Sequence, residues 1–274
     1  MSQRTKARLR IWALALAGLL CLGGIYGGYA AEYTMLGRDI VESAGSNGGV
    51  LSGSTVETLM LAPNWTATSY PGTRELPVTL KAMASSSSDA GWVVVTGVDS
   101  ALAEVTDSVY VTFAAPGTFR GRWRGVNSVA FHDDSTNVGE IRLWHGLAHN
   151  NSTPDSILAV IPPRERVANI AFFTVPAPYT KLYPRDLRLV FSTATTADKM
   201  AVGVWGVLKR DPGQAKEPFD QGVLRVPSGM VVMSYDSRDV VSVVPGTELQ
   251  VAAGVTASVS LPVDASARFR FGLQ

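Results

Sequence analysis

Two of the three histidines in this 274-residue chain, His145 and His149, have a spacing that could serve metal chemistry. Residues four apart lie on one face of a helix, where two imidazoles can bind zinc. The segment from Trp144 onward, however, ends a strand-like run and enters a loop, and no Glu stands beside a histidine as in zinc proteases. We therefore expect His145, His149 and the third histidine, His132, to be ordinary strand-end and loop residues.

An oxygen-rich segment directly after His132 is the second metal candidate. Asp133, Ser135 and Asn137 occupy alternate positions, with Glu140 beyond them, and calcium loops supply oxygen ligands in this way. The central glycine of such loops is missing, and Asp and Asn are normal turn residues. We expect a hairpin turn here and no bound metal.

Signatures of covalent and phosphate chemistry are absent from the sequence. It contains no Gly-x-Ser-x-Gly nucleophile elbow and no glycine-rich loop followed by Lys and Ser or Thr. The chain has a single cysteine, Cys21, so a disulfide within the chain is excluded. Cys21 lies in an apolar run. Acidic pairs of the glycosidase kind could meet in space, but the acidic residues stand mostly in turn-like segments. We expect no catalytic residues, no cofactor and no enzyme.

The basic cluster outside the N-terminus consists of Arg120, Arg122 and Arg124. On a strand, this alternation would place all three side chains on one face. Such a face is either simply solvated or a possible binding patch for phosphate or an acidic protein. The net charge of +1 offers no wide basic surface, so we expect no nucleic-acid partner.

Tryptophans and asparagines raise the question of carbohydrate. The tryptophans of the β-rich part are spread one to a strand or loop, which favours burial in a core, although exposed rings could stack on sugars; they are Trp65, Trp92, Trp123, Trp144 and Trp205. Asn64, Asn150 and Asn151 begin N-glycan acceptor motifs. These acceptors matter only if the domain faces a eukaryotic lumen.

Short strands must position these residues, because apolar runs rich in β-branched and aromatic residues alternate with Gly, Pro, Ser and Asn. With 46% hydrophobic residues, the chain can build a sizeable core. The predicted fold is all-β, an antiparallel β-sandwich or jelly-roll-like domain. The predicted strands are 56–61, 76–83, 92–98, 108–113, 126–131, 138–144, 157–161, 168–175, 186–192, 201–208, 222–226, 230–235, 240–244, 247–252, 257–263 and 267–271.

This β-sandwich domain is expected to cover residues 56–274. The polar stretch at 211–218 either divides the domain into two or forms a long loop within one sandwich, and we favour the loop. Residues 32–55 are rich in Gly, Ser and Asn, which is typical of a flexible connector.

The N-terminus indicates a membrane. A basic tail, residues 1–10, precedes the uncharged apolar run Ile11–Ala31, which is long enough to span a bilayer as one transmembrane helix. The positive-inside rule then places the N-terminus inside and the β-domain across the membrane. A cleaved signal peptide ending near Ala30 is the alternative.

Four glycines favour a retained anchor. Gly23, Gly24, Gly27 and Gly28 form two overlapping Gly-x-x-x-Gly pairs, which let a second helix approach closely in a bilayer. The expected partners of this segment are the lipid bilayer and, by helix packing, a second copy.

An ordered set of motifs over residues 92–210 resembles β-rich virion structural proteins, of the minor capsid type, from tailed phages and large DNA viruses. The motifs are Trp92-Val-Val-Val-Thr-Gly97-Val-Asp99, Glu104-Val-Thr106, the pair Val126-Asn127 with Asn137-Val138-Gly139-Glu140-Ile141 as a hairpin, Phe173-Thr-Val-Pro176, Thr180-Lys-Leu-Tyr183 and Lys209-Arg210. The resemblance implies packing within a particle and carries over no active-site residue.

Taken together, the resemblance and the apolar run predict a minor capsid protein that tethers the capsid shell to an internal membrane. Its expected partners are other capsid proteins and lipid, and its expected location is the interface between membrane and capsid. The alternative is an exported β-sandwich, membrane-anchored or secreted, that binds carbohydrate through exposed tryptophans.

Overall fold

The computed structural model describes residues 31–41, 57–58, 77–113, 115–132, 137–145, 157–193, 201–214, 217–226, 229–235, 239–256 and 263–274. These residues form strands β1 to β17 and their turns, with no helix among them. All pairings between the strands are antiparallel. The predicted all-β, antiparallel fold is confirmed.

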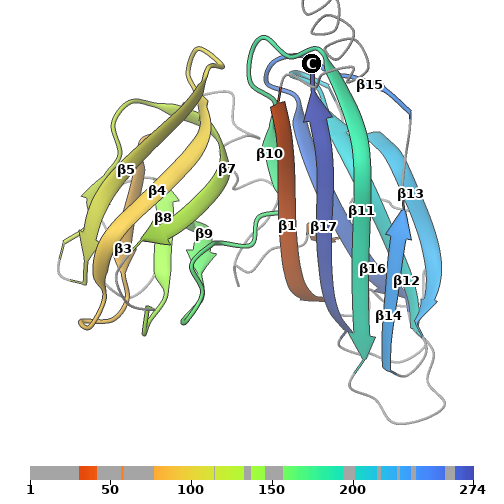
Figure 1. Cartoon of the computed structure of the whole chain (residues 1–274), viewed down its shortest axis with the longest axis horizontal. Coiled ribbons are helices and arrows are strands. Elements are labelled where there is room, and N and C mark those ends of the chain that lie inside the picture. Colours follow the sequence, from red (N-terminus) through yellow and green to blue (C-terminus); the bar gives the residue numbers. More distant parts are fainter. Residues whose placement is uncertain are drawn as a thin grey trace, which may run out of the picture.

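The larger of two β-sandwiches, the large sandwich, is built from sheets A and B (Figure 1). Sheet A has the order β1–β17–β11–β14, with β15 beside β11; the bounds are β1 Ala31–Val41, β17 Val263–Leu273, β11 Lys181–Thr193, β14 Gly229–Tyr235 and β15 Val241–Ser242. Sheet B has the order β10–β16–β12–β13, with β2 beside β16; the bounds are β10 Phe172–Thr174, β16 Glu248–Thr256, β12 Ala201–Arg210, β13 Glu217–Val226 and β2 Glu57–Thr58.

Alternation along the strands of sheet A separates core from solvent. In β17, Phe269 and Phe271 are buried, while Arg268 and Arg270, which alternate with them, are exposed. β11 repeats the pattern, with Leu187 and other apolar residues inside. Side chains of a strand point alternately to its two faces, so this period of two produces one apolar and one polar face. The inner faces of sheets A and B enclose the core of the large sandwich.

The second unit, the small sandwich, is formed by sheets C and D. Sheet C has the order β5–β4–β7, with bounds β5 Glu104–Thr112, β4 Ala90–Asp99 and β7 Trp123–His132. Sheet D has the order β6–β3–β8–β9, with bounds β6 Gly117–Thr118, β3 Leu80–Ala84, β8 Ile141–His145 and β9 Ile157–Ile161. Its core contains several of the largest buried side chains, Trp123 and Phe131 among them.

The small sandwich is an insertion, because β3 to β9 lie between β2 and β10 of the large sandwich. The described strands of the expected domain 56–274 therefore pack around two cores. In Figure 1 the two sandwiches lie side by side, with β1 and β10 next to the small sandwich. The chain that returns from β9 pairs first with β7, at Ala130–Val167, and then with β1, at Leu36–Ile170.

The start of the expected connector is a strand instead. β1 pairs with β17 along its whole length, from Ala31–Leu273 to Val41–Val263. Two of its side chains fix it to the core: Met35 is buried, and Tyr33 packs against Phe271 at a ring-centroid distance of 5.8 Å. Residues 32–41 are thus part of sheet A, and Ala31 opens it.

The rest of the N-terminal expectations lie outside the described residues. These are the basic tail 1–10, the apolar run up to residue 30 with its four glycines, and residues 42–55 of the connector. Within the described part of the chain, no helix combines the length and hydropathy that crossing a bilayer requires.

The polar stretch at 211–218 connects two paired strands. β12 and β13 form a hairpin across it, with Lys209 opposite Glu217. The Lys209 ammonium lies 3.1 Å from Asp211 and 3.2 Å from Glu217. Burial alone would lower the pKa of Lys209, but its hydrogen bonds to the two carboxylates raise it.

Candidate interaction surfaces

The seam between the sandwiches is polar at its centre. Asn127 of β7 donates from Nδ2 to the Thr174 carbonyl (3.0 Å) and accepts at Oδ1 from the Thr174 backbone N–H (2.8 Å). Both residues are buried. The approach requires glycine at 125, because a Cβ there would lie 2.1 Å from Thr174 Oγ1. The asparagine thus pairs with a backbone that would otherwise lack its hydrogen bonds.

A second contact crosses the seam at its rim. The Tyr33 hydroxyl of β1 donates to Glu104 Oε2 at the start of β5, at 3.0 Å. Burial, followed by the nearby Glu104 carboxylate, raises the pKa of Tyr33 well above its usual value. The Ala177 N–H also donates to the Leu102 carbonyl, at 2.7 Å. These bonds fix β4–β5 of the small sandwich to the large one.

The metal candidates are not brought together. His132 is exposed at the end of β7 in sheet C, whereas His145 is buried at the end of β8 in sheet D, and His149 lies outside the described residues. The described residues hold no cluster of three or more His, Cys, Asp or Glu side chains that could bind a metal.

The oxygen-rich segment serves the fold where it is described. Asn137 is buried and donates from Nδ2 to the carbonyls of Gly139 and Pro162, each at 2.7 Å. Asp89 accepts from the N–H groups of Val138 and Gly139. Asp133 and Ser135 lie outside the described residues. The expectation of a hairpin is wrong, since β7 and β8 do not pair with each other and belong to different sheets.

The three clustered arginines do not share a strand face. Arg120 and Arg122 precede β7, and Gly121 between them has φ +73°, so the chain turns there. Only Arg124 lies in the strand. The Arg122 guanidinium donates to the Pro77 carbonyl at 3.2 Å, and the Arg120 N–H donates to Asp107. Strand alternation therefore fails for this cluster, and a binding role for Arg120, Arg122 and Arg124 stays a prediction.

The described tryptophans divide into core and surface. Trp123, Trp144 and Trp205 are buried, as expected from the sequence. Trp92 is 51% exposed and stands opposite Tyr110, itself 53% exposed, on the outer face of sheet C. Their rings meet edge to face at 5.5 Å. The exposed pair is therefore an apolar patch on the small sandwich. Trp65 and the acceptors Asn64, Asn150 and Asn151 lie outside the described residues.

A second apolar patch lies on the large sandwich. Met230 (69% exposed) and Val232 (44%) belong to β14, the last strand of sheet A, and Val232 stands opposite Val190 of β11. In the part of the chain that the structure describes, β14 pairs with β11 on one side only. An exposed apolar edge of this kind is a ready contact surface for another protein.

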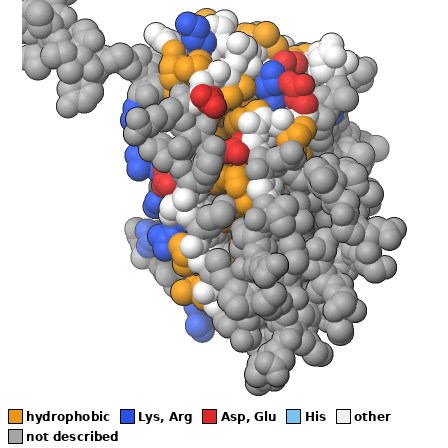
Figure 2. Space-filling view, turned by 90° about the vertical axis from the view of Figure 1, so that its right-hand side faces the viewer, with side chains coloured by type: hydrophobic (Ala, Val, Ile, Leu, Met, Phe, Trp, Pro, Cys, Tyr) orange, Lys and Arg blue, Asp and Glu red, His pale blue; other side chains and the backbone are white. Residues whose placement is uncertain are grey.

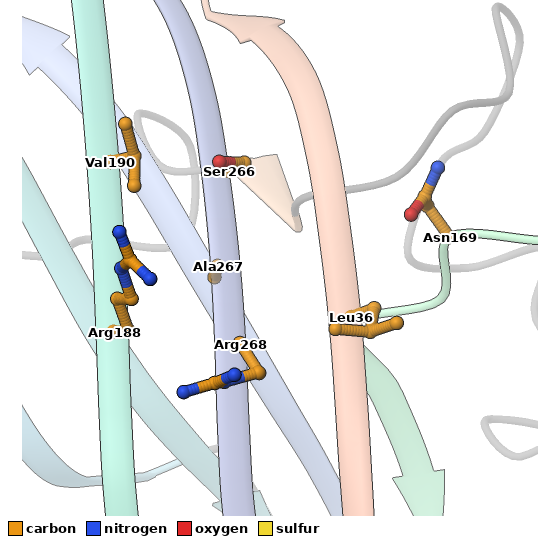
Figure 3. Close-up of a pocket in the computed structure, with 7 residues that line it drawn as sticks. All are labelled: Leu36, Asn169, Arg188, Val190, Ser266, Ala267 and Arg268. Atoms are coloured by element: carbon orange, nitrogen blue, oxygen red, sulfur yellow. The ribbon is translucent and has the colours of Figure 1, made fainter. Parts of the chain in front are cut away.

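The outer face of sheet A also carries a shallow pocket of about 280 Å³ between β1, β17 and β11 (Figure 3). It is lined by Leu36, Asn169, Arg188, Val190, Ser266, Ala267 and Arg268. Lys and Arg side chains also line the left edge of the surface in Figure 2, the side to which this face turns. The patterns Asp186-Leu-Arg-Leu and Ala267-Arg-Phe-Arg predict outward arginines, but only strand pairing brings Arg188 next to Arg268.

Comparison with known proteins identifies no relative. No family model matches the chain, and no curated protein matches it. Among solved structures, "Structure of infectious bursal disease virus Gx strain" covers 88% of this chain and 71% of that chain, at 10% identity and a TM-score of 0.27. "Crystal structure of infectious bursal disease virus VP2 subviral particle" covers 90% and 81%, at 9% identity and a TM-score of 0.14. Similarities this low carry no argument about fold or function.

Proposed function

We propose that this chain is a structural virion protein, a minor capsid component without enzymatic activity. The observation that carries the proposal is the pair of apolar patches, one on each sandwich. Trp92 and Tyr110 form the patch on sheet C, and Met230 and Val232 form the patch on sheet A. Exposed apolar patches are typical of surfaces that contact other proteins.

Two patches on two sandwiches suit a protein that packs between neighbours. Figure 1 places β5 in the left-hand part of the molecule and β14 in the right-hand part, so two partners could be engaged at once. A shell repeats each contact many times, and weak individual contacts then suffice. The motif resemblance over residues 92–210 supports the same role.

The membrane part of the proposal depends on the apolar run. Residues 11–30 would cover about 30 Å as a helix, the thickness of the hydrocarbon core. Because β1 begins at Ala31, an anchored large sandwich would lie directly at the bilayer surface. The tether would therefore be short, and the capsid shell would be held close to the internal membrane.

Fractionation of purified particles tests this role. The full-length chain should remain with particles through a density gradient and be released only by detergent, with residues 1–30 intact by mass spectrometry. Recovery solely as a soluble protein that has lost residues 1–30 would exclude the tether. Replacing Met230 and Val232 with Ser should weaken retention on particles without unfolding the protein.

Carbohydrate binding is the second candidate, favoured by the exposed Trp92 ring. Thr96 and Thr106, whose hydroxyls lie 3.0 Å apart, stand on the same two strands. Sugars stack on such rings and bond to such hydroxyls. Against this, the Trp92 and Tyr110 rings are at 74° and do not form one flat platform. A glycan array probed with the native protein and with Trp92→Ala decides, and binding that is unaffected by the substitution removes this candidate.

A further inference from the structure

The outer face of sheet A carries an excess of positive charge around the pocket. Arg188, Arg268 and Arg270 are exposed, and Asp186 is the carboxylate among them. Arg268 pairs with Asp186 at 3.1 Å. Arg185, at the end of the same face, is matched by Glu32 at 3.3 Å. Among these described side chains, four arginines against two carboxylates leave a surplus of two positive charges.

Two of these arginines stand directly opposite each other. The register pairs Arg188 of β11 with Arg268 of β17. Residues opposite each other on one sheet face have Cβ atoms about 5 Å apart, and like charges in such pairs are destabilising. Among the described side chains, no carboxylate bonds to Arg188, and the facing residue on β14 is Ser234. In Figure 3 the Arg268 side chain extends from β17 toward β11, below Arg188.

We propose that this pocket docks an acidic segment of a partner protein, with one carboxylate held between Arg188 and Arg268. A guanidinium offers a planar fork that fits a carboxylate, and two forks around one anion would relieve their mutual repulsion. Ser266 and Asn169 add neutral hydrogen-bonding groups at the pocket wall. The inference does not depend on the virion role, since an acidic segment would dock in the same way in any partner.

The lining of the pocket favours a protein segment over a nucleic acid. Leu36 and Val190 add apolar wall beside the charged groups. A peptide with alternating acidic and apolar residues complements both kinds of surface, whereas a nucleic acid offers repeated phosphates and needs a wider basic surface. The whole chain has a net charge of only +1, which is not enough to build one.

Fluorescence anisotropy with the full-length chain in a neutral detergent tests the proposal. The probe is a fluorescein-labelled peptide of alternating Glu and Ala, compared with the same peptide carrying Gln for Glu. We expect the Glu peptide to bind at low salt and to weaken as salt rises. Arg188→Gln should weaken binding by about tenfold, which corresponds to one charge-assisted hydrogen bond. The double variant R188Q/R268Q should abolish it.

The matched control is R164Q/R166Q, which removes two other exposed arginines and should change the affinity by no more than about twofold. Equal binding of the Gln peptide, or an equal loss in the control, would overturn the proposal. It would also be overturned if a single-stranded oligonucleotide of matched charge displaced the peptide and bound more tightly through the same arginines. Sedimentation of the protein without peptide tests whether a second copy occupies the pocket instead. If R188Q converts an oligomer to monomers and leaves peptide binding intact, the occupant is a second copy and the proposal is overturned.

Discussion

Asn127 and Thr174 form two hydrogen bonds with each other across the seam between the sandwiches, one in each direction. The asparagine side chain supplies the donor and the acceptor that a neighbouring strand would otherwise offer to the Thr174 backbone. Because both residues are buried, the pair couples the two cores across the seam. Without it, the seam would enclose an unpaired N–H and an unpaired carbonyl.

Asn127→Ala should therefore destabilise the protein by about 2–4 kcal/mol, because it leaves the buried backbone N–H and carbonyl of Thr174 without hydrogen-bond partners. It should also separate the unfolding of the two sandwiches, so that one urea transition becomes two. Ser128→Ala, at an exposed position next along β7, is the control and should unfold as the native chain does. A single transition, within about 0.5 kcal/mol of the native value, would show that the pair does not couple the cores.

Gly125→Ala should destabilise the same seam, and its effect should be coupled to that of Asn127→Ala. A Cβ at 125 meets Thr174 Oγ1 at 2.1 Å and Thr174 Cβ at 2.6 Å, so Gly125→Ala forces β7 and β10 apart at a cost of about 1–3 kcal/mol. Once the seam is open, losing Asn127 should cost less. Urea unfolding of the double variant G125A/N127A should thus show a loss smaller than the sum of the single losses. Strict additivity would contradict a shared seam.

The strand content was predictable because its signal is local. Alternation in Asp186–Phe191 and Ala267–Phe271 fits a strand with one buried face, and both segments have that form in β11 and β17. The pairing of these two strands was not predictable, since nothing near Arg188 in the sequence indicates Arg268. The pocket between them exists only because the register of β11 and β17 places these side chains together. The insertion of the small sandwich was not predictable either, because alternation indicates a strand but not the sheet to which it belongs.

β1 was missed for a different reason. Its composition, with Gly37 and several charged residues, is that of a connector, and it directly follows an apolar run. Tyr33 and Met35, two apart, were the available signal of an inward face. Tertiary contacts decide the outcome: pairing with β17 satisfies the backbone, and the two side chains enter the core. The Arg120–Arg124 cluster shows the opposite error, where alternation in the sequence is interrupted by a turn at Gly121.

Arg188→Gln should raise stability slightly, by about 0.2–1 kcal/mol, because it removes a like charge opposite Arg268. Arg268→Gln should give no such gain, since it also removes the ion pair with Asp186. Thermal unfolding of the two variants in low and high salt measures the difference, which should shrink as salt screens the repulsion. If both variants are destabilised equally, the two arginines do not repel each other in the folded protein.

Tyr33→Phe should make the protein less sensitive to alkaline pH. Its raised pKa means that the folded chain keeps the Tyr33 proton at pH values where the unfolded chain, near 10, has lost it. The unfolded state then binds fewer protons, so stability falls as pH rises above about 10. Phenylalanine removes this dependence but keeps the ring against Phe173 and Phe271. Urea unfolding between pH 8 and pH 11 should give a shallower decline in stability for Tyr33→Phe than for the native chain. The control is Tyr110→Phe, at an exposed tyrosine opposite Trp92 in sheet C, which should decline as the native chain does. Parallel declines in all three proteins would show that Tyr33 ionises alike in both states and that its bond to Glu104 contributes nothing to the seam.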